Sequence, residues 1–88
     1  MTKKEIKVVN TLGIHARPAG MIANTAGRFQ SDIKMIKDGM EVNAKSIMGL
    51  MTLAAGRNTV ITLSAAGPDE KEAVAALEDL FSRKFEEE

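Results

Sequence analysis

The residues with the clearest chemical potential are His15 and Arg17, in the stretch LGIHARPAG at residues 12–20. His15 is the only histidine of the chain. A neutral imidazole nitrogen can attack phosphorus, and a guanidinium can bind a phosphate through two parallel hydrogen bonds. The pair therefore suggests phosphoryl transfer, although a lone histidine is also compatible with a plain surface or turn residue. One histidine without any cysteine offers too few ligands for a metal site, and no cofactor is expected.

A helix following His15 would position both side chains. Residues at helical spacing form an apolar face, and Pro18 would occupy the first turn, where a missing N–H group matters little. His15 is thus expected at or near the N-cap. The positive end of the helix dipole attracts anions and disfavours the imidazolium form, so the ring should stay neutral and nucleophilic. The Arg17 guanidinium is expected to face solvent. The apolar face consists of Ala19, Ile22, Ala23 and Ala26.

The remaining segments predict the order β-α-β-β-α-β-α. Alternating apolar residues indicate strands, and an Asp38-Gly39 dipeptide suits a two-residue hairpin turn. In the last helix, Asp69 and Glu72 resemble a capping box, and the acidic end at residues 86–88 is expected to fray. We predict an α+β open-faced sandwich whose antiparallel sheet is covered by helices on one face. The expected strands are residues 5–9, 32–37, 40–43 and 59–65.

Composition narrows the function classes. The 88 residues, with zero formal net charge and no tryptophan or tyrosine, describe one domain spanning residues 1–88 and make nucleic acid an unexpected partner. No apolar stretch is long enough for membrane insertion, and no signal-peptide run is seen. We therefore expect a cytoplasmic protein. As a self-contained small domain, it is also expected to be a monomer.

The segment SIMGLMTLAAG predicts a short helix that Ser46 would cap. Leu50 and Leu53 are expected to supply core contacts. A short helix cannot bury every side, so the apolar residues Ile47, Met48 and Met51 are expected to remain partly exposed as a partner-binding surface.

Two motifs carry a family resemblance. GIHARPAG resembles the active-site signature of the HPr family, the histidine-containing phosphocarriers of the bacterial phosphoenolpyruvate-dependent sugar phosphotransferase system, and KSIMGLMTLAAG resembles its signature around a regulatory serine. The resemblance extends over nearly the whole chain and implies the strand order 1-4-2-3. Gly20 departs from the family pattern, where alanine or a small hydroxylated residue is frequent. Asn58 stands where glycine is frequent.

The resemblance implies specific roles. His15 would take a phosphoryl group on Nδ1 from phosphorylated enzyme I and pass it to enzyme IIA domains of sugar transporters, and Arg17 would stabilise that group. Ser46 would be the target of HPr kinase/phosphorylase, allowing binding to a LacI-type catabolite control protein. The chain would be a carrier rather than a turnover enzyme.

Two alternatives stay open. A regulatory HPr paralogue would act mainly through Ser46 in catabolite repression or in a nitrogen-related phosphotransfer branch, but the presence of both His15 and Arg17 argues against it. An unrelated α+β module that binds a small molecule would transfer no phosphate. Incubation with phosphoenolpyruvate and enzyme I separates the carrier from these alternatives.

Overall fold

The computed structural model describes residues 1–86 and follows the predicted order of elements. Its bounds are β1 (Thr2–Lys7), α1 (Ala16–Ala26), β2 (Asp32–Lys37), β3 (Met40–Asn43), α2 (Ile47–Leu53), β4 (Val60–Ala66), α3 (Glu70–Ser82) and a 3₁₀ turn, η1 (Lys84–Glu86). The first strand begins and ends earlier than its alternation predicted, and Val8 is buried beyond its end.

The four strands form one antiparallel sheet in the order β1-β4-β2-β3, as predicted. The alternation that identified β4 places Ile61, Leu63 and Ala65 in the core. Ile6 lies opposite Ile61, and Met35 lies opposite Leu63, so β1, β4 and β2 present their buried side chains to the same layer. The polar alternate residues of β1 face away from that layer.

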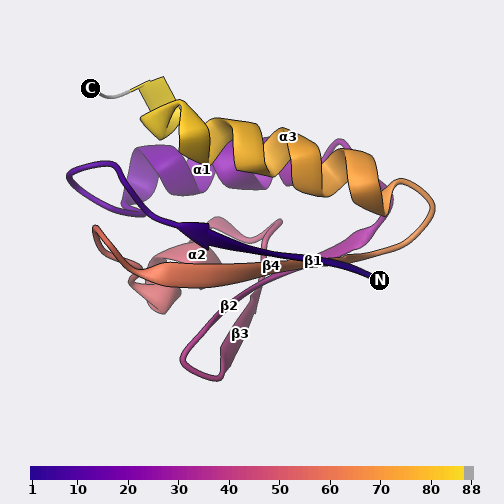
Figure 1. The fold of residues 1–88 in the computed structure, drawn as a ribbon, viewed down its shortest axis with the longest axis horizontal. Coiled ribbons are helices and arrows are strands. Elements are labelled where there is room, and N and C mark those ends of the chain that lie inside the picture. Colours follow the sequence, from indigo (N-terminus) through magenta and orange to yellow (C-terminus); the bar gives the residue numbers. More distant parts are fainter. Residues whose placement is uncertain (87–88) are drawn as a thin grey trace.

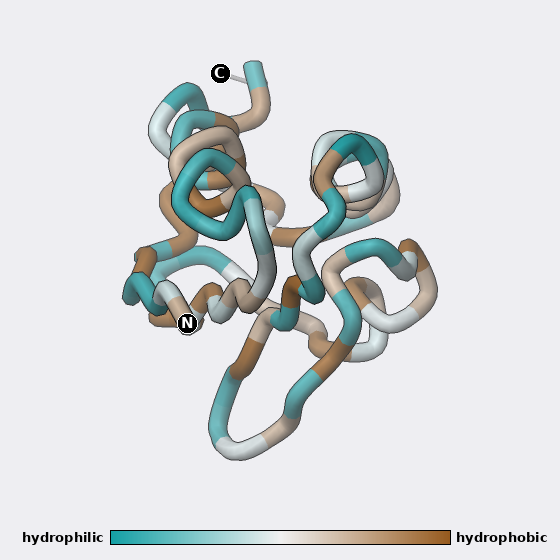
Figure 2. Tube along the Cα trace, turned by 90° about the vertical axis from the view of Figure 1, so that its right-hand side faces the viewer, coloured by the Kyte–Doolittle hydropathy of each residue, from teal (hydrophilic) through white to brown (hydrophobic). Residues whose placement is uncertain are grey.

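Helices α1 and α3 form a second layer over one face of the sheet, and α2 lies closer to the level of the strands (Figure 1). Helix α3 packs on β1 and β4, whereas α2 packs beside β3, and α1 contacts both other helices. Figure 2 shows α1 and α3 side by side on the same side of the sheet, with the β2–β3 hairpin extending away from them. The predicted apolar face of α1 is buried, which anchors the helix that follows His15.

At two turns the backbone is left-handed where the sequence predicted it. Asp38 and Gly39 have φ values of 50° and 82°, as a two-residue hairpin of the primed type requires. Asn58 has a φ of 71°, so asparagine supports a left-handed turn at the position where the family resemblance suggested glycine.

The predicted capping box of the last helix is wrong. Asp69 is the N-cap of α3, but its side chain makes no capping bond. Its carboxylate instead accepts hydrogen bonds from the backbone N–H groups of Gln30 and Ser31 and from the Ser31 hydroxyl. The loop before β2 brings these donors to Asp69, and they replace the helix N–H groups as its partners.

The C-terminal end also differs from the sequence-based expectation. Glu86 lies in η1 and accepts a hydrogen bond from Arg83 at 3.0 Å, whereas the other two acidic residues of the predicted frayed end, Glu87 and Glu88, lie outside the described residues. Within residues 1–86, no helix combines the length and the apolar character needed to cross a membrane.

Candidate functional site

His15 is the N-cap residue of α1, as the sequence predicted. Its backbone is extended, with φ −93° and ψ −166°, and its carbonyl oxygen accepts the first helical hydrogen bond from Ala19 N at 2.9 Å. The side chain makes no capping bond and is half-buried. The imidazole therefore sits at the positive end of the helix with a partly exposed surface.

The loop before His15 is fixed by contacts that the sequence reasoning missed. Asn10 is fully buried, and its Nδ2 donates to the Gly13 carbonyl oxygen at 2.7 Å. Gly13 has a φ of 69°, and a Cβ there would lie 2.6 Å from the Ala55 carbonyl oxygen. Ile14 N donates to that same oxygen at 2.9 Å. These contacts bring the His15 loop against the chain that leaves α2. The local signal in the sequence was the pair Asn10 and Gly13, two residue types that are common in turns.

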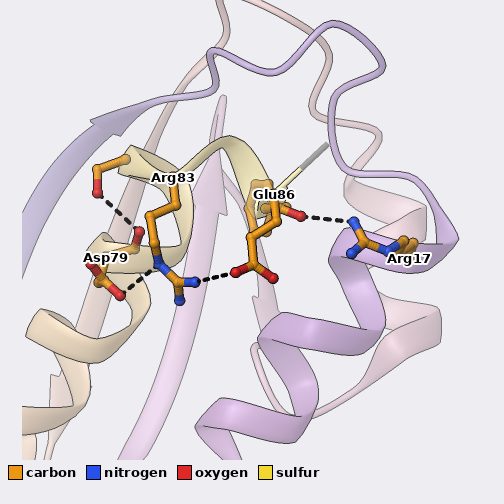
Figure 3. A network of polar contacts seen from close by, with 6 residues as sticks. Arg17, Asp79, Arg83 and Glu86 are labelled. Atoms are coloured by element: carbon orange, nitrogen blue, oxygen red, sulfur yellow. Dashed lines mark hydrogen bonds and ion pairs between the residues drawn. The ribbon is translucent and has the colours of Figure 1, made fainter. Parts of the chain in front are cut away.

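Arg17 lies in the first turn of α1 and is exposed, but its guanidinium does not simply face solvent as predicted. Its Nη1 donates to the Phe85 carbonyl oxygen at 2.7 Å (Figure 3). Sequence reasoning did not identify Phe85 as part of the site. The available signal was its apolar side chain at i+4 from Phe81, which continues the buried face of α3 beyond the helix.

The charges at this end of α1 favour an anion. The first turn contains Arg17 and no acidic residue, and the N–H groups of any helical first turn point out of the N-terminal end. Among residues 1–86, no group of three or more histidine, cysteine, aspartate or glutamate side chains could hold a metal ion. The arrangement of imidazole, guanidinium and helix end is suited to a phosphoryl group.

Helix α2 presents the second candidate region. Ser46 is its N-cap, and the Ser46 hydroxyl accepts a hydrogen bond from Gly49 N at 3.0 Å. Leu50 and Leu53 are buried. The exposed residues, here called the docking patch, have relative accessibilities of 48% for Ile47, 80% for Met48 and 46% for Met51. Because α1 packs against α2 and Ile14 N donates to Ala55 O, the His15 loop lies next to the helix that presents the docking patch.

The chain is similar to proteins of one known family. The family model described as "PTS HPr component phosphorylation site" matches residues 2–83. The phosphocarrier protein HPr of Treponema pallidum is 50% identical over 88 residues, covering all of both chains.

Solved structures are similar as well. A crystal structure of HPr from Thermoanaerobacter tengcongensis superposes with a TM-score of 0.97 and 49% identity, covering 100% of this chain and 99% of that one. A crystal structure of an HPr dimer from the same organism has a TM-score of 0.78 and 48% identity, with 97% of this chain and 98% of that chain covered. The similarity to HPr proteins, in sequence and in fold, therefore extends over all of the described residues.

Proposed function

This chain belongs to the HPr family of phosphocarrier proteins, and we propose that His15 is the residue that carries its phosphoryl group. The observation that carries the proposal is the position of the sole histidine at the N-cap of α1, above a first turn that contains an arginine and no acidic residue. A phosphoryl group on this ring would lie where the helix dipole and Arg17 stabilise negative charge.

The transfer step needs no proton acceptor. The lone pair of Nδ1 attacks phosphorus while the bond between phosphorus and the donor, phosphorylated enzyme I, breaks. The hydrogen on Nε2 stays in place. In the second step, the Nδ1–phosphorus bond breaks as an enzyme IIA domain accepts the group. The chain ends each cycle unchanged as a carrier and, in this proposal, has no turnover activity of its own.

The docking patch is proposed to bind both protein partners. Exposed methionines are flexible and can adapt to different surfaces, which suits a protein that must bind a donor and several acceptors in turn. Met48→Glu should therefore weaken binding to enzyme I and to IIA domains while the fold is retained. Met40→Glu is the matched control, because Met40 is 48% exposed but lies in β3 outside the patch. Equal affinities of the two variants for both partners would exclude the patch.

Ser46 is proposed as the regulatory site. Its hydroxyl already lies at the N-terminus of α2, where a phosphate would be stabilised by the helix end. HPr kinase/phosphorylase would supply the modification, and a LacI-type catabolite control protein would bind the product. The family resemblance supports these partners, and the cap geometry is compatible with the modification.

The proposed transfer cycle also implies where the protein acts and in which oligomeric state. Residues 1–88 would act as one domain in the cytoplasm, where the donor and the transporter domains meet. We propose a monomer as the working form, since each partner must reach both His15 and the docking patch. A dimer structure exists for the Thermoanaerobacter tengcongensis protein, so the oligomeric state of this chain has to be measured directly.

The test is transfer of label from phosphoenolpyruvate through enzyme I. The wild-type chain should become labelled, with the acid-labile and base-stable behaviour of phosphohistidine, and His15→Ala should not. Arg28→Ala serves as a control, because Arg28 is exposed beyond the opposite end of α1. Label on His15→Ala would contradict the assignment of His15.

A further inference from the structure

The chain after α3 adopts an unusual backbone. Lys84, Phe85 and Glu86 have φ values of 53°, 55° and 61°, so three consecutive residues with a Cβ occupy the left-handed region. This conformation is unfavourable for such residues and persists where surrounding contacts enforce it. Contacts must therefore stabilise η1.

Those contacts come from two sides. The Phe85 side chain is fully buried, and its ring meets the Phe81 ring edge-on with a centroid distance of 4.9 Å. On the exposed side, Arg83 pairs through Nε with Asp79 at 2.9 Å and through Nη1 with Glu86 at 3.0 Å (Figure 3). The buried ring and the paired guanidinium together fix the turn.

The left-handed turn determines the direction in which the Phe85 carbonyl group points. Phe85 O points toward α1 and accepts the hydrogen bond from Arg17 Nη1 at 2.7 Å. A long exposed arginine side chain otherwise samples many rotamers. A guanidinium has five N–H donors, so a bond to Phe85 O is compatible with a bidentate contact to phosphoryl oxygens.

We propose that Phe85 is a positioning residue for phosphoryl transfer: its buried ring fixes the left-handed turn whose carbonyl oxygen orients the Arg17 guanidinium in the first turn of α1. The inference rests on the proposed roles of His15 and Arg17. Phe85 does not contact the phosphoryl group and acts through Arg17 alone. Its side chain is buried, so it also does not contact the partner proteins.

The test compares Phe85→Ala and Phe85→Leu in the enzyme I transfer assay. Phe85→Ala should lower kcat roughly tenfold with an unchanged KM, because misplacing a group that stabilises the transferring phosphoryl affects the chemical step and not docking. Phe85→Leu, which retains an apolar anchor, should recover most of the rate. Phe29→Ala is the matched control, because Phe29 packs against the core beyond the far end of α1 and should leave kcat unchanged.

The Arg17→Ala background separates positioning from general damage. If Phe85 acts through Arg17, adding Phe85→Ala to Arg17→Ala should cause no further loss of kcat. A wild-type kcat for Phe85→Ala, or a full additional loss in the Arg17→Ala background, would overturn the proposal while the labelled wild-type chain still supports the carrier function. An unlabelled wild-type chain would reject both.

Circular dichroism establishes whether Phe85→Ala is folded. If it is not, Arg83→Ala weakens the same turn from an exposed position, and we expect a roughly threefold loss of kcat with partial rescue by Arg83→Lys. An unchanged kcat for a folded Arg83→Ala would then overturn the proposal.

Discussion

Arg17 has a contact in this structure that changes the expected outcome of its removal. As a solvent-facing side chain, it should alter stability by only about 0.5 kcal/mol when replaced by alanine. The bond to Phe85 O adds a structural role, because Arg17→Ala would leave the Phe85 carbonyl oxygen without this hydrogen-bond donor. Arg17 is therefore both a proposed phosphoryl ligand and a connection between α1 and η1.

We predict that Arg17→Ala slows phosphorylation of His15 by roughly 10²-fold, since a charged donor to the transferring group is lost. Its free energy of unfolding should fall by about 1 kcal/mol, since one hydrogen bond to a carbonyl is also lost. Transfer kinetics and urea denaturation measure the two effects. Arg28→Ala should show neither effect, and a normal transfer rate with a large stability loss would make Arg17 purely structural.

The Ser46 hydroxyl is a helix cap whatever its regulatory role, so a charged substitute must be compared with a neutral one. Aspartate and asparagine cap helices about as well as serine. The free energies of unfolding of Ser46→Asp and Ser46→Asn should therefore both lie within about 0.5 kcal/mol of the wild-type value. A negative charge beside the docking patch should repel an acidic partner surface. Only Ser46→Asp should therefore accept phosphate from enzyme I more slowly.

Salt provides the decisive measurement for Ser46. If the defect is electrostatic, raising the salt concentration should partly restore the rate of Ser46→Asp, with most of the change in KM. Ser46→Asn should keep the wild-type rate at every salt concentration. If Ser46→Asp and Ser46→Asn accepted phosphate equally fast, and HPr kinase left Ser46 unmodified in the presence of ATP, the serine would be a plain cap.

At the scale of elements, α1 contains a glycine that its packing does not require. A Cβ added at Gly20 would meet no atom within 4 Å. Gly20→Ala should raise the free energy of unfolding by up to about 1 kcal/mol, because alanine has the higher helix propensity. Thermal or urea unfolding measures the gain.

Gly13→Ala is the opposite case in the same region, because its φ is 69° and its Cβ would lie 2.6 Å from the Ala55 carbonyl oxygen. This substitution should destabilise the loop that holds His15 and reduce the transfer rate. For Gly20→Ala, unfolding at a lower denaturant concentration than the wild type would contradict the predicted gain. It would show that a contact of α1 requires glycine at this position.

Elements with local signals were predictable from the sequence. The alternation in β4 identified its buried residues, and the Asp38-Gly39 dipeptide identified the hairpin. The position of His15 followed from the apolar spacing of α1 and from Pro18. The capping box of α3 failed because a local pattern cannot show that a carboxylate has stronger partners elsewhere. Asp69 meets Ser31, which lies 38 residues away along the chain.

The same limit applies to the candidate site as a whole. Arg17 and Phe85 are separated by 68 residues, and no periodicity in either segment indicates that they meet. The strand order came from the family resemblance, since alternating strands alone do not determine which neighbours pair. Once β1 and β4 are paired, α3 lies over them and its C-terminal end can reach α1. The complete site is therefore a property of the whole molecule.

Two neighbouring carboxylates at the start of α3 also connect distant parts of the molecule. Hydrogen bonds from the Ser31 side chain and from the backbone of Gln30 and Ser31 hold the pKa of Asp69 below its usual value. The Thr2 hydroxyl, the Gly67 N–H group and the N-terminal amine lower the pKa of Glu70 to about 2. Each carboxylate therefore binds its partners more strongly when it is ionised.

We predict that these groups make the fold sensitive to acid. A pKa that is lower in the folded state contributes stability above the unfolded values, 3.8 for Asp69 and 4.5 for Glu70, and that stability is lost as pH falls through the folded values, which for Glu70 means toward about pH 2. Urea midpoints measured between about pH 2 and pH 7 should therefore fall on acidification in the wild type and fall less in Asp69→Asn combined with Glu70→Gln. Glu72→Gln, an exposed change in the same helical turn, should follow the wild-type profile. If the double variant and the wild type lost stability in parallel, carboxylates elsewhere would be responsible for the acid sensitivity.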